Sequence, residues 1–149
     1  MSLTQFHWNT EDQKALDRAQ SYGDLLLIAK DVISRMRKPV VQVCGPISTG
    51  GTGVMSENID RLKKKIDALE RQDVEIFNQI PFQYRIQAIA AARGVKDYEH
   101  ELLNEFYLPI FESGLVQELY FMPDWQTSEG SRWEHAQGER LGMKITYLE

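Results

Sequence analysis

The chain alternates short apolar runs with longer segments whose apolar residues are spaced as in helices, and this alternation most constrains the fold. The runs are residues 40–44, 74–78, 116–122 and 143–148. Short runs rich in β-branched residues are typical of strands buried on both faces. Strands that alternate with helices form a parallel sheet covered by helices on both sides. We therefore predict an α/β fold with a parallel sheet of about four to five strands.

The segments between these runs are predicted to be helical because their apolar residues recur three or four positions apart. The predicted helices cover residues 10–37, 56–69, 82–93, 98–113 and 130–141. Gly23 is expected to divide the first of them into two helices. Gly94 and Gly142 follow helical segments and are expected to end them. We therefore predict an N-terminal helical extension, residues 1–38, and an α/β domain, residues 39–149.

With 149 residues, of which 42% are hydrophobic, the chain is long enough to form one domain with a real core. Its formal net charge of -5 gives no overall basic surface for polymeric nucleic acid. No run approaches the roughly 18 apolar residues that a membrane helix needs, and the N-terminus lacks the pattern of a signal peptide. The single cysteine cannot form an internal disulfide. We expect a cytoplasmic protein that contacts neither membranes nor polymeric nucleic acid.

The start of the last predicted helix combines hydroxyl groups, a glycine and an acidic residue. Ser128, Gly130 and Ser131 stand where this helix begins, and Glu134 follows one turn inside it. The unpaired N–H groups and the positive dipole end of a helix start bind anions well. Glu134 would lie about 6 Å further along the helix axis. Because this is about the reach from a 5′-phosphate to the anomeric carbon of a ribose, we predict a phosphate site and a nucleophilic glutamate facing one sugar.

A glycine-rich loop, residues 45–53, follows the first predicted strand. It lacks the Gly-Lys-Ser/Thr end of a P-loop and the third glycine of a dinucleotide fingerprint, so a ligand loop and a flexible turn are both open interpretations. Ligands bind beyond the carboxyl ends of parallel strands, and this loop and residues 123–130 both leave such ends. Gly45, Pro46 and Ser48 are therefore predicted to line one pocket with the start of the last helix.

Two further residues near this helix start are candidate ligand contacts. Trp125 offers a flat face for a base, or it packs in the core, and Arg132 is a cation that would offset repulsion between a phosphate and the glutamate. His135 and Glu139 have the i, i+4 spacing of metal ligands, but no third ligand follows at a recognisable spacing. Cys44 is interpreted as a small core residue rather than a nucleophile. We predict no metal and no cofactor.

Three segments together resemble the nucleoside 2-deoxyribosyltransferase superfamily: residues 42–48 (QVCGPIS), residues 74–78 (VEIFN), and residues 122–134 (MPDWQTSEGSRWE) with Leu141 and Gly142 after them. The resemblance covers about residues 39–148 and is nearest to a small, largely uncharacterised branch, and then to the nucleotide N-glycosidases. It implies a flavodoxin-like Rossmann fold and a glutamate that attacks the anomeric carbon, here Glu134. The base then leaves, a glycosyl-enzyme ester forms, and water or a second base resolves it.

The resemblance also implies which residues would bind the substrate. In nucleotide-cleaving members a Ser-x-Gly turn holds the 5′-phosphate, and this turn corresponds to Ser128 and Gly130. Nucleoside-transferring members carry an acidic residue near that serine, so the resemblance favours a nucleoside 5′-monophosphate or a related nucleotide. Members usually carry an aspartate aimed at the sugar or base, on the helix before the third strand, but residues 108–113 contain none. Glu112 or Asp124 would have to replace it.

We therefore expect an N-glycosidase or deoxyribosyltransferase that acts on a small nucleotide or nucleoside and forms homo-oligomers. Two alternatives stay open. The missing aspartate also fits a nucleotide-binding or sensing module that has kept the fold and lost the chemistry. The N-terminal helices also fit a structural subunit that oligomerises through them.

Overall fold

The computed structural model describes residues 7–94 and 98–149, which form an α/β fold on a parallel sheet. Its strands are β1 (Val41–Cys44), β2 (Glu118–Phe121) and β3 (Lys144–Tyr147), in the spatial order β1-β2-β3. The strands pair in register, with Val41 opposite Glu118 and Glu118 opposite Lys144. Because they run parallel and start together, their carboxyl ends lie at one edge of the sheet. The loops that follow these ends are the ones that the sequence predicts to form a pocket.

The predicted strand at residues 74–78 joins this sheet through a single bridge, between Ile76 and Val41. The expected count of four to five strands is therefore not confirmed in the part of the chain that the structure describes. The pairing stops because the side chain of Gln79, rather than its backbone, reaches the next carbonyl of β1. Its Nε2 donates to the oxygen of Val43 at 3.3 Å. A side-chain amide thus takes the position that a longer strand would fill with a backbone N–H.

The remaining elements are helical. They are α2 (Thr10–Arg18), α3 (Tyr22–Ser34), α4 (Met55–Arg71), α5 (Gln83–Arg93), α6 (Tyr98–Leu102), α7 (Leu108–Glu112) and α8 (Glu129–Leu141), with 3-10 turns η1 (Ile80–Phe82) and η3 (Trp125–Thr127) and a π-helical turn η2 (Leu103–Tyr107) between α6 and α7. Gly94 and Gly142 adopt the left-handed conformation and end α5 and α8, as predicted. The first helical segment divides just before Gly23, because the Ser21 hydroxyl caps α3 by accepting from the backbone N–H of Asp24 at 3.0 Å. No helix of the described residues is long and apolar enough to cross a membrane.

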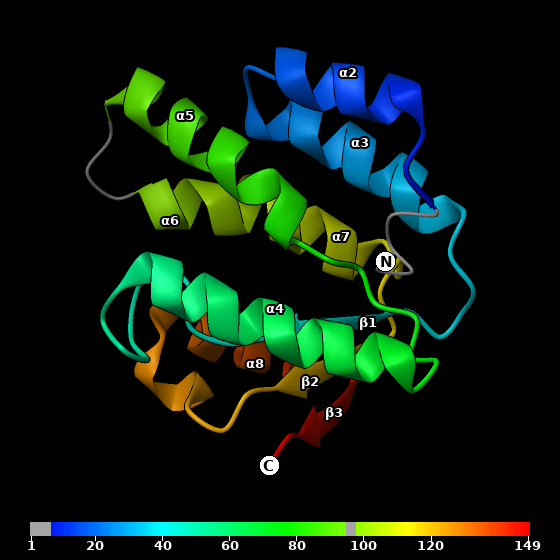
Figure 1. The fold of residues 1–149 in the computed structure, drawn as a ribbon, viewed down its shortest axis with the longest axis vertical. Helices are drawn as coiled ribbons and strands as arrows, with labels where there is room; N and C mark the ends of the chain where they lie inside the picture. Colours follow the sequence, from blue (N-terminus) through cyan, green and yellow to red (C-terminus); the bar gives the residue numbers. More distant parts are fainter. Residues whose placement is uncertain (1–6, 95–97) are drawn as a thin grey trace.

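Helices cover the two faces of the sheet in separate layers (Figure 1). Leu62 and Ile66 of α4 pack with Val41 and Val43 on one face. The other face, which carries Leu119 and Phe121, belongs to a larger core that includes residues of α3, α5, α7 and η2. This division follows from the alternation of side chains along each strand.

The N-terminal helices share that larger core. Leu25 and Ile28 of α3 are buried in the same cluster as Phe106 of η2 and Leu119 of β2. Figure 1 shows α2 and α3 beside α5 and above α7, at the end of the molecule away from β3. Residues 10–34 therefore contribute directly to the hydrophobic core around the sheet.

Candidate functional site

A cavity lies beside the start of α8, where the loops after β1 and β2 meet. Six of the residues predicted from the sequence line it: Gly45, Ser48, Ser128, Gly130, Ser131 and Glu134. The facing wall comes from the residue before η1 and from α5, α6 and η2, and includes Gln79, Gln83, Glu99, Leu103 and Tyr107. The cavity is small, about 40 Å³, and the empty space measured out to open solvent is about 480 Å³. Only a few atoms of a ligand would therefore fit within the cavity, and the rest would lie in its open mouth.

Glu134 is the most constrained side chain of this cavity. Only 6% of it is exposed, and its Oε2 accepts a hydrogen bond from Nε2 of Gln42 at 2.6 Å. The thiol of Cys44 lies near the carboxylate and donates to the carbonyl of Gln42 at 3.9 Å. Burial raises the pKa of Glu134 to about 8; Cys44 and Gln42 oppose the rise, and the nearby Glu99 carboxylate adds to it. In the free protein Glu134 therefore keeps its proton at neutral pH.

Gln42 hydrogen-bonds to Glu134 in the candidate site, but it was not predicted from the sequence. It lies in the middle of β1 and is fully buried. Its Oε1 has no hydrogen-bond partner within the described residues. The hydrogen bond that the amide does form is its donation to Glu134. A buried amide is costly unless it is hydrogen-bonded. A glutamine inside a β-branched strand was therefore a signal that another buried polar group lay opposite it.

Cys44 is fully buried at the end of β1, next to Glu134. Burial and the charge of Glu134 raise the pKa of its thiol well above the ordinary value. The thiol therefore stays protonated, and it donates to the carbonyl of Gln42. This agrees with its interpretation as a core residue rather than a nucleophile.

A second carboxylate, Glu99 of α6, shares the cavity with Glu134. Its Oε1 accepts a hydrogen bond from the Ser48 hydroxyl, while its Oε2 is buried and has no partner in the described chain. From the sequence, the candidates for a second acidic group in the site were Glu112 and Asp124. Glu112 pairs with Arg140 and Asp124 with Arg61, and neither lines the cavity. No local pattern distinguishes Glu99 from its acidic neighbours, so only the packing of α6 reveals it.

The π-helical turn η2 shapes the wall opposite Glu134. Leu103 and Tyr107, at its two ends, both line the cavity. Such turns are rare and often occur at functional sites, because the wider turn redirects side chains. Burial, followed by the charge of Glu134, raises the pKa of Tyr107, and the side chain of Gln83 opposes the rise. Tyr107 is therefore a neutral phenol facing the site.

The start of α8 has fewer free donors than the sequence suggests. The Ser128 hydroxyl caps the helix by accepting from the N–H of Ser131 at 3.2 Å. The N–H of Glu129 donates to the Thr49 hydroxyl at 3.0 Å. Arg132 is exposed, donates to the carbonyl of Gln126 at 2.7 Å, and does not line the cavity. Two of the amides that would hold an anion, and the predicted cation, are thus engaged elsewhere.

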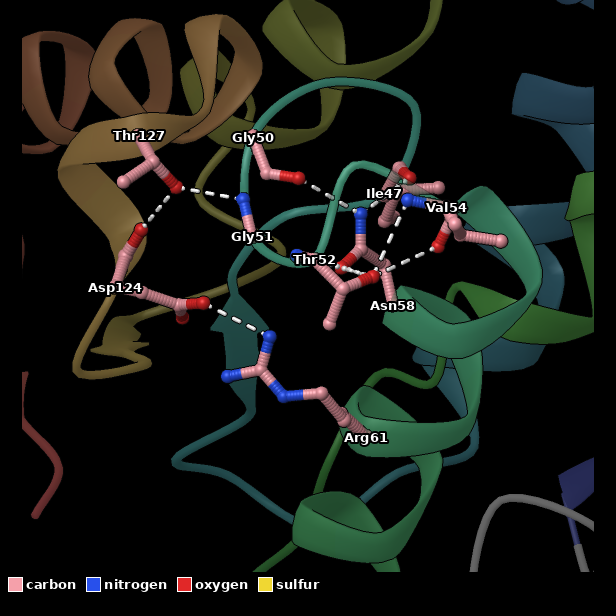
Figure 2. A network of polar contacts seen from close by, with 9 residues as sticks. All are labelled: Ile47, Gly50, Gly51, Thr52, Val54, Asn58, Arg61, Asp124 and Thr127. Atoms are coloured by element: carbon pink, nitrogen blue, oxygen red, sulfur yellow. Dashed lines mark hydrogen bonds and ion pairs between the residues drawn. The ribbon is translucent and has the colours of Figure 1, made fainter.

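The glycine-rich loop is held in place by Asn58 of α4, as Figure 2 shows. The buried Asn58 side chain donates to the carbonyls of Ile47 and Gly50, both at 3.1 Å, and accepts from the N–H of Thr52. On the other side, the N–H of Gly51 donates to the Thr127 hydroxyl at 2.8 Å. These contacts fix the loop between α4 and η3. Its first part therefore presents Gly45 and Ser48 to the cavity, whereas Pro46 is buried and does not line it.

Trp125 and Asp124 stabilise the loop after β2 rather than the cavity. The Trp125 ring stacks on His135, with centroids 4.3 Å apart and an interplanar angle of 15°. The same aromatic cluster contains Phe121 and Tyr147. Asp124 forms an ion pair with Arg61 of α4 at 2.8 Å (Figure 2). Neither of these two predicted ligand contacts lines the cavity. Trp125 packs against α8, and Asp124 connects the loop to α4.

Gly50 and Gly53 of this loop allow a matched stability test, because only the first of them is crowded by its neighbours. Gly50 and Gly53 both have positive φ angles, but a Cβ on Gly50 would lie 2.2 Å from the carbonyl oxygen of Thr127, whereas a Cβ on Gly53 meets no described atom within 4 Å. Both alanine variants strain the backbone, and only Gly50→Ala also separates the loop from η3. We expect Gly50→Ala to lose about 1–3 kcal/mol more than Gly53→Ala in urea unfolding. Equal losses would show that the contact with Thr127 does not hold the loop.

No protein family, curated protein or solved structure matches this chain. Among residues 7–94 and 98–149, no group of three or more His, Cys, Asp or Glu side chains is arranged to hold a metal ion. The chemistry of the site must therefore be inferred from the geometry of its own residues.

Proposed function

We propose that the protein cleaves the N-glycosidic bond of a small nucleoside or nucleotide, by hydrolysis or transfer, with Glu134 as the nucleophile. The observation that carries this proposal is a buried carboxylate, oriented by Gln42, that lines a cavity beside the start of α8. Perturbed carboxylates in such clefts are frequent catalytic groups. Glu99 lines the same cavity, so both carboxylates would contact a ligand bound there.

The reaction would proceed in two steps. A carboxylate oxygen of Glu134 attacks C1′ of the sugar, the C1′–N bond breaks, and its electron pair leaves with the base. A water molecule then attacks C1′ of the resulting ester while Glu99 accepts a proton from it, which restores the Glu134 carboxylate. In a transferase, the nitrogen of a second base would take the place of this water.

The strand arrangement supports the flavodoxin-like form of the fold implied by the resemblance. Val41 bonds to residues 75 and 77 through its own N–H and carbonyl, so residues 74–78 lie on the side of β1 away from β2. With this segment included, the spatial order is residues 74–78, β1, β2, β3. This is the start of the doubly wound order found in flavodoxin-like sheets, in which ligands bind beyond the strand ends next to β1.

A binding module without catalysis is the second candidate, and one observation favours it. Burial raises the pKa of Glu134 to about 8, and a protonated carboxyl group is not a nucleophile. Such a module would hold a nucleoside or nucleotide through the same cavity and leave its glycosidic bond intact.

Base release from a panel of ribonucleosides, deoxyribonucleosides and their 5′-monophosphates distinguishes the two candidates. We expect the wild-type protein to release the base from at least one member, because Glu134 lines the cavity in which C1′ of the sugar would bind. Chromatography of the free base measures the rate. Binding without release, with an affinity that Glu134→Gln leaves unchanged, would instead identify the binding module.

A further inference from the structure

The cavity has an unusual charge for a site that would take a phosphorylated ligand. It contains two carboxylates, Glu99 and Glu134, and none of its lining residues in the described chain is Lys, Arg or His. The nearest arginine to the helix start, Arg132, donates to a backbone carbonyl outside the cavity. Charges in a site that is partly shielded from water interact strongly. A phosphate would therefore meet two acidic groups and, among the described lining residues, no compensating cation.

The unpaired atoms of the cavity also favour a ligand that donates hydrogen bonds. Oε1 of Gln79 and Oε2 of Glu99 are buried and have no partner among the described residues. The orientation of the Gln79 amide is set by its donation to Val43, so Oε1 is the atom left over. Both atoms are acceptors, as are the oxygens of an ionised phosphate, whereas sugar hydroxyls donate. The hydroxyl of Ser131, also buried and unpaired, is able to bond with either.

We propose, on the basis of the function proposed above, that the substrate is an unphosphorylated nucleoside joined to its base through a positively charged ring nitrogen, as in a pyridinium nucleoside. Its sugar hydroxyls donate to the unpaired acceptors of Gln79 and Glu99. Its positive charge offsets the two carboxylates that the described lining leaves without a cation. The substrate thus supplies both the donors and the charge that the cavity lacks.

The chemistry of such a substrate balances with the residues present. When Glu134 bonds to C1′, the electron pair of the breaking C1′–N bond neutralises the ring nitrogen, so the base leaves without receiving a proton. Water then hydrolyses the ester, and Glu99 accepts one proton from it and passes that proton to solvent. The products are the free sugar, the neutral base and one proton. The aspartate that the sequence lacks is therefore not needed to protonate the leaving group.

A cationic substrate also explains how a buried, protonated Glu134 becomes a nucleophile. An adjacent positive charge favours the ionised form of a carboxyl group and lowers its pKa. Binding of the pyridinium nucleoside near neutral pH should therefore expel the proton that the free protein holds on Glu134. A phosphate in the cavity would have the opposite effect.

Four compounds test the proposal with the full-length protein: ribosylpyridinium, its 5′-monophosphate, uridine and uridine 5′-monophosphate. Base release gives kcat/KM, and calorimetry in buffers of different ionisation enthalpy gives Kd and the protons released on binding. We expect ribosylpyridinium to exceed its monophosphate at least about tenfold in kcat/KM and affinity, and to release about one proton on binding. A monophosphate that reacts and binds equally well or better would overturn the inference and leave the proposed function intact.

Two variants separate the charge effect from a loss of structure. Glu99→Gln keeps the shape of the side chain and should reduce the preference for ribosylpyridinium over uridine, which a merely structural role would not change. Glu101→Gln is the control, because Glu101 pairs with Arg93 outside the cavity. If neither these four compounds nor any member of the nucleoside and nucleotide panel above is cleaved, the proposed function fails, and the order of the four affinities still decides which ligand charge the cavity accepts.

Discussion

Replacing Glu134 by glutamine is expected to lower kcat/KM for base release by roughly 10⁴- to 10⁶-fold, as removal of a nucleophile or its partner does in other hydrolases. The amide is a much weaker nucleophile than the carboxylate, but its oxygen still accepts the hydrogen bond from Gln42. The fold should therefore be retained. Glu129→Gln is the matched control, since Glu129 is exposed on the first turn of α8. Equal turnover by wild type and Glu134→Gln would remove Glu134 from the mechanism.

The pH dependence of the same reaction should report the ionisation of Glu134. Attack requires the carboxylate, and the pKa of Glu134 in the free protein is raised to about 8, first of all by burial. kcat/KM should therefore rise about tenfold per pH unit below pH 8 and level off above it. With a cationic substrate, the inflection of kcat should lie at lower pH than that of kcat/KM, because kcat reports the bound state. An inflection of kcat/KM near the ordinary glutamate value of 4.5 would contradict this assignment.

Glu134 should also make the protein less stable as the pH rises. The unfolded chain releases this proton near pH 4.5, whereas the folded chain holds it up to about pH 8. Between these values the folded state binds the additional proton, so unfolding releases it and becomes more favourable with increasing pH. The loss is complete above pH 8 and amounts to about 5 kcal/mol.

Denaturant unfolding of wild type and Glu134→Gln across this pH range measures the effect. The glutamine variant carries no titrating group at this position, so above pH 8 it should be more stable than wild type by about 5 kcal/mol. Below pH 4.5 the two proteins should differ little, because both then carry a neutral side chain there. A difference that does not change with pH would show that Glu134 does not titrate inside the core. Glu129→Gln should follow the wild type throughout.

Some of the fold and of the site could be predicted from the sequence because it depends on residues close together in the chain. Gly94 and Gly142 end their helices because a left-handed residue suits that position, and Ser128 caps α8 through a bond to a residue three positions on. The spacing from Ser128 to Glu134 is a property of one helix. The sequence therefore placed Glu134 correctly beside Ser128, Gly130 and Ser131 in one cavity wall.

Only the tertiary structure decided what faces Glu134 across the cavity. Gln42 precedes it by 92 positions, and Glu99 comes from a helix whose own sequence looks like a polar surface. The side chains of Asp124, Trp125 and Arg132 were predicted to contact a ligand, but they bond to other elements and do not line the cavity. Helical and strand periodicity set which face of its own element a side chain occupies, but not which element packs against that face. The charge of the cavity, and the ligand it suits, depend on the packing of α5, α6 and η2 against the sheet.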